Sequence, residues 1–234
     1  MTQAIPKLVT FDEFAAWRPE SGRYELHDGV IVEMAQPTGD HEDVVGFIAR
    51  KVTIEFDRLN LPYIIPKTAL IKPPHSESSY SPDVLILNRP NLVNEPLWQK
   101  ASTVSYAASI PLVVEVVSQC VARVSRVEAT DVSAALASLR ASPVRVSSNW
   151  DDDYYTKQGK YESIGIPEYW VVDYLGLGAK KFTGTPKQPT ISIYQLIDDE
   201  YQVTRFRGRE RIISPTFPEL NLTAEQIFHA GDIP

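Results

Sequence analysis

The hydrophobic pattern of the chain combines short, continuous apolar runs with one long helical repeat. Residues 111–118 form an apolar run that contains a single acid, Glu115, and residues 84–87 form another that directly follows Asp83. Runs of this length, rich in β-branched residues, are typical of strands covered on both faces. The apolar positions of residues 41–59 recur instead at helical spacing. This alternation predicts an α/β (α+β) fold in which a mixed central sheet is flanked by helices.

Turn and capping signals place the other elements. Asp28-Gly29 between two apolar segments predicts a hairpin, and Gly165 followed by Pro167 predicts the end of a helix. The predicted elements are, in order, a helix over 11–17, the hairpin around 28–29, a helix over 41–59 capped by Asp40, strands near 63–65, 69–72, 83–87 and 111–118, a helix over 151–165, a strand over 169–173, a C-terminal β-ribbon over 190–213 that turns at Asp198-Asp199, and a short helix over 223–229.

Residues 119–147 differ in composition from the rest of the chain. Ala, Ser, Val and Arg dominate them, and no aromatic residue occurs between Tyr106 and Trp150. Such a segment offers little apolar area to offset the entropy of ordering it. We therefore expect one domain over residues 1–234, with residues 119–147 as a protruding insertion that is disordered or, up to Arg140, weakly helical.

Composition and charge narrow the class of protein. With 43% hydrophobic and 23% charged residues, the chain has the composition of a globular protein. Its net charge of −7 argues against indiscriminate nucleic-acid binding but allows a local basic groove. The single Cys120 excludes an intrachain disulfide framework and is compatible with a reducing cytosol, so a cytoplasmic location is expected. No stretch approaches the length of a membrane span, and no signal-peptide core is visible.

Two acids in predicted core strands suggest a chemical function. A buried carboxylate must be paired, protonated or bound to a metal, because an isolated buried charge costs many kcal/mol. Asp83 and Glu115 together therefore suggest a divalent-metal site built on the sheet. The alternative is that each acid pairs with a nearby arginine or caps a turn. If they form a site, their carboxylates should converge at one end of adjacent strands, within about 4–6 Å of each other.

A family resemblance emerges when residues 119–147 are set aside. Val114-Glu-Val-Val-Ser118 then leads directly into Ser148-Asn-Trp-Asp-Asp-Asp-Tyr-Tyr-Thr-Lys157. The other motifs are Tyr24-Glu-Leu-His-Asp-Gly29, Thr38-Gly-Asp-His41, Pro82-Asp83 and Lys160-Tyr-Glu-Ser-Ile-Gly-Ile-Pro-Glu-Tyr-Trp-Val-Val-Asp173. In this order they resemble the bacterial Uma-type restriction endonuclease family, a branch of the PD-(D/E)XK nuclease superfamily. The resemblance covers nearly the whole chain outside residues 119–147.

The resemblance implies a restriction-endonuclease-like fold and metal-dependent hydrolysis of DNA. Asp83 and Glu115 would hold Mg²⁺, or Mn²⁺, with a backbone carbonyl near Val116 and water molecules completing the shell, which suits such hard cations. The superfamily usually places a lysine two residues after the glutamate, where this chain has Val117. The resemblance to this branch implies that the lysine has moved to the following helix, at Lys157, where it would orient the attacking water and offset negative charge.

Each further candidate residue also has a purely structural explanation. Lys157 lies four residues after Asp153, so the two could form an ordinary ion pair on a solvated helix face. Glu25 either helps to bind metal or position water, or is a half-buried acid of the hairpin. His41 belongs to the family-like turn, but side chains at a helix start often serve only the cap region. The three acids at 151–153 are explained by helix capping.

A basic pattern near the C-terminus offers a candidate nucleic-acid surface. Arg205, Arg207, Arg209 and Arg211 alternate along the second strand of the predicted ribbon, so they are expected to share one face. Such a stripe could follow the phosphates of a nucleic acid. The alternative is a solvated face or a charged edge strand that discourages aggregation.

The sequence thus favours an endonuclease with DNA as its partner. The alternative is a catalytically inactive module with the same fold that binds nucleic acid or protein, because the lysine is displaced and the insertion begins beside Glu115. A purely structural domain is disfavoured by the two acids embedded in strands. A membrane partner is not expected, whereas a homodimer and a separate specificity partner both remain open.

Overall fold

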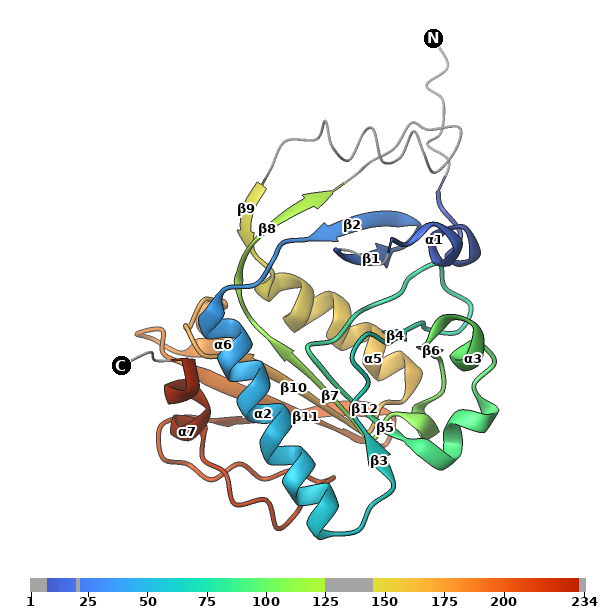
Figure 1. Ribbon diagram of the computed structural model, residues 1–234. Coiled ribbons are helices and arrows are strands. Elements are labelled where there is room, and N and C mark those ends of the chain that lie inside the picture. The colour runs from blue at the N-terminus through green and yellow to red at the C-terminus, as the bar shows by residue number, and fades with distance from the viewer. Residues whose placement is uncertain (1–7, 20–21, 125–144, 232–234) are drawn as a thin grey trace.

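The computed structural model describes residues 8–19, 22–124 and 145–231. Figure 1 shows helices on both sides of a central sheet, with a smaller sheet beside it. The elements are α1 (Phe11–Trp17), β1 (Arg23–His27), β2 (Val30–Met34), α2 (Gly39–Arg58), β3 (Tyr63–Ile64), β4 (Leu70–Ile71), β5 (Val84–Asn88), η1 (Arg89–Asn94), α3 (Trp98–Ala101), β6 (Thr103–Val104), η2 (Ala107–Ser109), β7 (Leu112–Val116), β8 (Gln119–Val124), β9 (Arg145–Ser148), η3 (Asp152–Lys157), α5 (Gln158–Ile164), β10 (Glu168–Asp173), α6 (Lys180–Thr183), β11 (Thr190–Ile197), β12 (Glu200–Phe206), α7 (Ala224–Phe228) and η4 (His229–Gly231).

The central sheet has six strands in the order β12-β11-β10-β7-β5-β3. Strand β10 runs parallel to β7, and the other neighbours are antiparallel, so the predicted mixed sheet is confirmed. The C-terminal ribbon forms as β11 and β12 and turns at Asp198 and Asp199, which both adopt positive φ. It is not a separate unit, because β11 pairs along its length with β10.

Alternate residues of the central strands face two different hydrophobic cores. Val84 of β5 and Val114 of β7 pack with the buried face of α2. Their neighbours Leu85 and Val113 belong to the second core, which includes Tyr161 of α5. Because side chains alternate along a strand, Glu115 must lie on the same face as Val113, toward η3 and α5. The sequence pattern of β7 therefore aims this acid at the helix that carries Lys157.

A second, four-stranded sheet has the order β1-β2-β8-β9. The chain enters it from the central sheet, since β8 begins just after β7 ends. This corrects the predicted bounds of the insertion: Gln119–Val124 and Arg145–Ser148 are paired antiparallel strands, and β8 also pairs with β2. Residues 125–144, which include the predicted weak helix, lie outside the described residues. The remainder of the insertion, and the single-domain organisation, stay predictions.

Two helix starts differ from the prediction. Helix α2 begins at Gly39, and Thr38 rather than Asp40 caps it through a hydrogen bond to the His41 amide. The predicted helix over 151–165 has two parts, a π-helical segment η3 followed by α5. Asp151 makes no capping hydrogen bond there, so capping does not explain the acids at 151–153. Within the described part of the chain, no helix is long and apolar enough to cross a membrane.

Candidate active site

Asp83 is fixed at the point where β5 begins beside β7. The antiparallel register pairs Val84 with Val114, which places Asp83 next to the end of β7 that carries the other acid. One carboxylate oxygen of Asp83, Oδ2, accepts a 2.9 Å hydrogen bond from the Val116 amide, and the other, Oδ1, pairs with the Arg23 guanidinium at 2.9 Å. Burial opposes ionisation, but its cationic and hydrogen-bonding partners, His41 foremost, hold the pKa of Asp83 well below its usual value. The acid is therefore an ionised group.

His41 connects Asp83 to the backbone of β7. Its Nε2 atom lies 3.3 Å from Oδ2 of Asp83 and 3.2 Å from the carbonyl oxygen of Val116. Burial lowers the pKa of His41, but the hydrogen bond and charge of Asp83, together with the Val116 carbonyl, outweigh burial and raise that pKa above its usual value. His41 is 2% exposed, so it is not a solvated cap side chain. The structure places it against two of the oxygen atoms that the sequence suggested as metal ligands.

Glu115 is buried and contacts Tyr161 and Lys157. Its Oε1 atom accepts a 2.9 Å hydrogen bond from the Tyr161 hydroxyl, and its Oε2 atom lies 3.1 Å from Nζ of Lys157. Burial raises the pKa of Glu115 well above its usual value, and the charges of Asp153, Asp83 and Glu25 add to the effect that Lys157 only partly offsets. Ionising Glu115 in this position is therefore unfavourable unless more positive charge lies nearby.

Lys157 reaches Glu115 from the end of η3. Its Nζ atom lies 3.1 Å from Glu115, 3.3 Å from Glu25 and 3.4 Å from Asp153. Burial lowers the pKa of Lys157, but the three carboxylates more than compensate and raise it well above its usual value. The expected ion pair with Asp153 exists, yet Lys157 is only 2% exposed. The alternative of a solvated pair on a helix face is therefore wrong.

Glu25 of β1 completes the group of acids around Lys157. Its Oε1 atom accepts a 3.0 Å hydrogen bond from the Ser81 amide, and its Oε2 atom lies 2.8 Å from Nε2 of His27. Burial alone would raise the pKa of Glu25, but Lys157 and His27 lower it to about 2. Glu25 is fully buried rather than half-buried, and it links the second sheet to the lysine.

The charge balance of the group favours an additional cation. Four carboxyl groups with little or no exposure, those of Glu25, Asp83, Glu115 and Asp153, face three basic side chains, Lys157, Arg23 and His41. Neither oxygen of Asp153 has a hydrogen-bond partner among the described residues, and burial raises its pKa to about 7. Buried negative charge in excess of positive charge is expensive. A bound divalent cation would offset it.

The donor atoms and the space fit a small, hard cation. Asp83, Glu115 and Lys157 line one cavity of about 10 Å³, enough for roughly one water-sized species. Two carboxylates and the Val116 carbonyl supply the oxygen ligands that Mg²⁺ prefers, and Mg²⁺ commonly retains water in its remaining positions. Within the described ranges, no group of three or more His, Cys, Asp or Glu side chains is arranged to hold a metal by itself. A metal here would therefore depend on the backbone carbonyl and on water.

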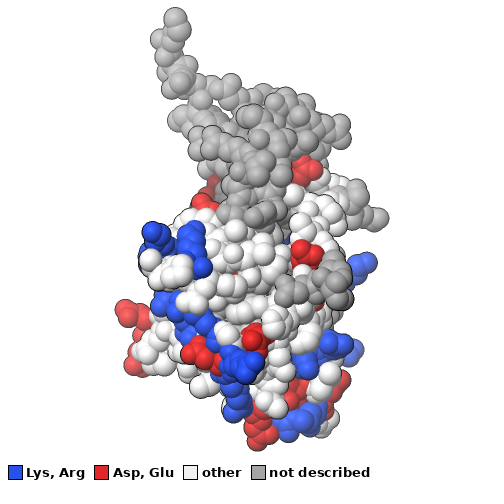
Figure 2. Space-filling view, turned by 90° about the vertical axis from the view of Figure 1, so that its left-hand side faces the viewer, with Lys and Arg blue, Asp and Glu red and all other residues white. Residues whose placement is uncertain are grey.

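The four C-terminal arginines do not form the predicted stripe. Strand β12 ends at Phe206, so only Arg205 lies on it. Arg207 bonds to Thr190 and to the Phe182 carbonyl. Arg209 pairs with Glu225, and Arg211 bonds to the carbonyls of Leu220 and Pro218. On the face drawn in Figure 2, Lys and Arg are interspersed with Asp and Glu. The expected basic strand face is wrong, because the regular strand stops before three of its members.

Two residues of this group were not recognised from the sequence. The sequence explains Asp153 by helix capping, whereas in the structure it is fully buried beside Lys157. Arg23 is not singled out by any sequence pattern, although it is the cation paired with Asp83. The spacing of Asp153 and Lys157 was a usable signal. The pairing of Arg23 with Asp83 joins segments far apart in sequence, and no local pattern indicates it.

Comparisons with known proteins agree with this architecture. The model of the Uma2 family, described as "Putative restriction endonuclease", matches residues 11–123 and 146–225, so its match omits residues 124–145. A similar solved structure is that of "a putative nuclease belonging to DUF820" from Anabaena variabilis ATCC 29413. It shares 13% sequence identity, with a TM-score of 0.63 over 95% of this chain and 99% of the other. No curated protein matches the chain. The predicted restriction-endonuclease-like fold is thereby confirmed.

Proposed function

The chain belongs to the Uma2 family, whose model matches well over half of it, and from this premise we propose that it is a metal-dependent endonuclease that hydrolyses phosphodiester bonds in DNA. Family membership and the nuclease among similar structures support a nuclease role. The observation that carries the proposal is the convergence of Asp83, Glu115 and Lys157 on one cavity, from a loop, a strand and a helix. A purely structural role does not require so many buried charges in one place.

Asp83, Glu115 and the Val116 carbonyl are the proposed ligands for Mg²⁺ or Mn²⁺. When bound, such an ion polarises a phosphate and makes a coordinated water a stronger nucleophile at neutral pH. In the described structure the oxygens of Asp83 contact Arg23 and His41. These two side chains hold the carboxylate ionised and in place, and they would have to yield part of their contact to the ion.

Lys157 is proposed to place a fixed positive charge beside the phosphate. Three carboxylates keep its ammonium protonated, as its raised pKa indicates, so it can donate hydrogen bonds to an attacking water and to a phosphate oxygen but cannot remove a proton readily. Its position is set by Glu25 and Asp153, which contact the same Nζ atom. The tight enclosure limits bulk water, which strengthens each electrostatic interaction.

The test is cleavage of plasmid and single-stranded DNA with and without Mg²⁺ or Mn²⁺. Wild type should cut only with metal, and Asp83→Asn should lose both cleavage and the rise in melting temperature that Mg²⁺ produces. Lys157→Ala should lose cleavage but keep a metal-induced rise, because the proposed ligands remain. The control is Lys160→Ala, which removes a partly exposed lysine of the following helix α5. A metal-independent activity, or full activity of Asp83→Asn, would refute the assignment.

A second candidate function is binding without catalysis. It is supported by the closed state of the group: both oxygens of Asp83 and both oxygens of Glu115 already have protein partners. In that case the wild type would cleave neither plasmid nor single-stranded DNA, with Mg²⁺ or with Mn²⁺. Mg²⁺ would also leave its melting temperature unchanged. Binding of labelled DNA by such an inactive protein, followed by fluorescence anisotropy, would favour this candidate over the nuclease.

A further inference from the structure

A groove opens directly beside the candidate active site. Arg23, His41 and Asp83 line the small cavity described above and also line this neighbouring hollow of about 470 Å³. The hollow extends from Asp83 to Arg18, at the end of α1, and to Lys67, in the connection between β3 and β4. We call it the Arg18 groove. Its volume lies in the range of ordinary ligand sites, about 300–1,000 Å³, and its inner end is the proposed catalytic centre.

The groove presents two basic side chains without acidic partners. Arg18 is partly buried, and burial lowers its pKa, yet within residues 8–19, 22–124 and 145–231 no carboxylate pairs with it. Lys67 is exposed and likewise has no ion pair within those ranges. Arg23, between them and the centre, is instead paired with Asp83. Glu42 also lines the groove, but within those ranges it pairs with neither cation. In a chain of net charge −7, two unpaired cations in one groove are the feature to explain.

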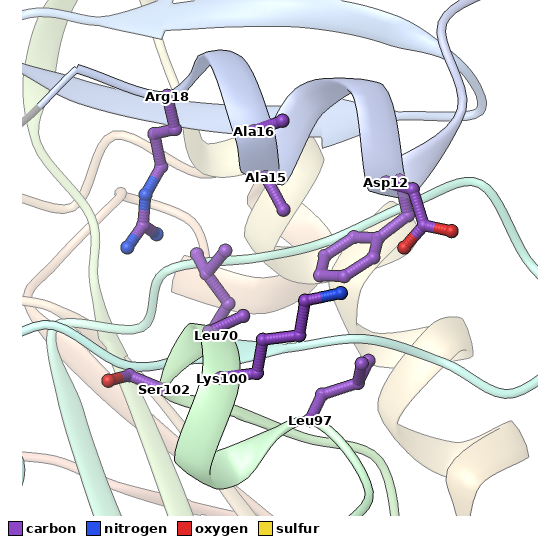
Figure 3. A pocket seen from close by; sticks show the side chains of 10 residues that line it. Asp12, Ala15, Ala16, Arg18, Leu70, Leu97, Lys100 and Ser102 are labelled. Atoms are coloured by element: carbon purple, nitrogen blue, oxygen red, sulfur yellow. The ribbon is translucent and has the colours of Figure 1, made fainter.

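The position of Arg18 in Figure 3 strengthens this point. Arg18 also lines a second hollow, below α1, together with Asp12, Leu70 and Lys100. Figure 3 shows its guanidinium at the end of that hollow away from Asp12, whereas the Lys100 ammonium lies on the Asp12 side. The acid of this hollow is therefore not directed at Arg18. Keeping a guanidinium partly buried without a counter-charge is unfavourable, and an anionic ligand would relieve the cost.

We propose that the Arg18 groove binds the DNA strand next to the bond that is cut, with Arg18 and Lys67 contacting its phosphates. This rests on the proposed function, because the scissile phosphate would lie at Asp83, and a polymer anchored there must continue through an adjoining opening. Phosphates are the repeating anions of such a polymer, and a guanidinium can contact one through two hydrogen bonds. Hydroxyl groups of Thr68 and Ser81 also line the groove and suit the same ligand.

The first experiment measures binding without cleavage. Affinity for a short fluorescein-labelled single-stranded oligonucleotide is followed by anisotropy in EDTA, over a range of salt concentrations. Arg18→Gln and Lys67→Gln should each weaken binding about tenfold, and each should reduce the slope of log affinity against log salt by about 0.7, the loss of one phosphate contact to a single strand. The matched control is Arg89→Gln, an exposed arginine just past the opposite end of β5 from Asp83; it should leave affinity and slope unchanged.

The second experiment separates this proposal from the proposed function. If the wild type cleaves DNA with Mg²⁺, the two groove variants should raise KM about tenfold while kcat changes little. If the wild type cleaves nothing, the nuclease assignment fails, but the anisotropy result still decides the groove. The groove proposal is overturned if the double variant binds as the wild type does, if its salt slope is unchanged, or if the wild type does not bind the oligonucleotide. Lys67 is exposed, so its substitution tests the proposal even if Arg18→Gln fails to fold.

Discussion

Replacing Lys157 by methionine should reveal how much of the stability of the fold depends on one buried charge. The ammonium contacts three carboxylates, at 3.1, 3.3 and 3.4 Å. Methionine is similar in length and apolar, so Lys157→Met removes the charge and little volume. The three acids would remain buried, and the cavity that Lys157 and Glu115 line has room for only about one water molecule. The variant therefore isolates the electrostatic contribution.

The magnitude follows from the cost of leaving buried charge unpaired. Removing one partner of a buried ion pair costs about 3–5 kcal/mol, and here one cation serves three acids, so the upper part of that range is expected. A domain of ordinary stability has a free energy of unfolding of about 5–15 kcal/mol. Lys157→Met should thus lose a large part of the free energy of unfolding at neutral pH. The matched variant Lys160→Met removes a lysine that is partly exposed and pairs with the exposed Asp28, which is worth at most about 1 kcal/mol.

The loss should depend on pH, with a definite sign. In the wild type, Lys157 and His27 outweigh the effect of burial and lower the pKa of Glu25 to about 2. A lowered acid pKa stabilises the fold above the unfolded value, near 4.5. Without Lys157 the pKa values of all three acids rise, so ionising these buried groups costs more free energy at pH 8 than protonating them at pH 5. A folded pKa above the unfolded value means that stability falls as pH rises through this interval. The difference between wild type and variant should therefore be larger at pH 8 than at pH 5.

Urea unfolding followed by tryptophan fluorescence measures this difference at both pH values. Trp170 is fully buried in the core next to these elements and should report global unfolding. The reasoning is refuted if Lys157→Met and Lys160→Met lose the same free energy, or if the loss from Lys157→Met is the same at pH 5 and pH 8.

Three further predictions use the same physical terms. His41→Gln should cost more stability at pH 6 than at pH 9, because a raised histidine pKa stabilises the fold only while the ring is protonated; denaturation across that interval checks the sign. Tyr161→Phe removes the 2.9 Å bond to Glu115 and should cost about 1–3 kcal/mol, measured by urea unfolding. Replacing residues 125–144 by an Asn-Gly turn should preserve the melting temperature, because β8 and β9 remain paired; a marked loss would show that this segment supports the fold.

The sequence predicted the elements that depend on local patterns. The apolar runs around Asp83 and Glu115 became strands because β-branched residues suit a sheet covered on both faces. The hairpin at Asp28 and the capped helix over 11–17 formed as expected, because their turn and capping interactions join residues close in sequence. For the same reason, the acidic turn at 198–199 was placed correctly.

The features that the sequence did not predict depend on distant partners. Strand β8 has a short sequence without clear apolar alternation, and its pairing with β2 and β9 decides its conformation. The ion pair of Arg23 with Asp83 likewise forms only when two sheets meet. The alternation of side chains along β7 predicts the face on which Glu115 lies. The burial of Lys157 depends instead on segments far away in the sequence that pack around it, and no local pattern predicts that.

The π-helical form of η3 sets the phase in which Lys157 meets the strands. An α-helix turns about 100° per residue, and a π-helix accommodates one extra residue in each turn. Deleting one residue between Asp153 and Lys157 would therefore convert this turn to α-helix, in which the two side chains lie three residues apart and remain neighbours on the helix surface. The helix α5 could keep its packing, because the deletion removes only the extra residue of the π turn. This turn can thus change its length by one residue without separating the lysine from Asp153.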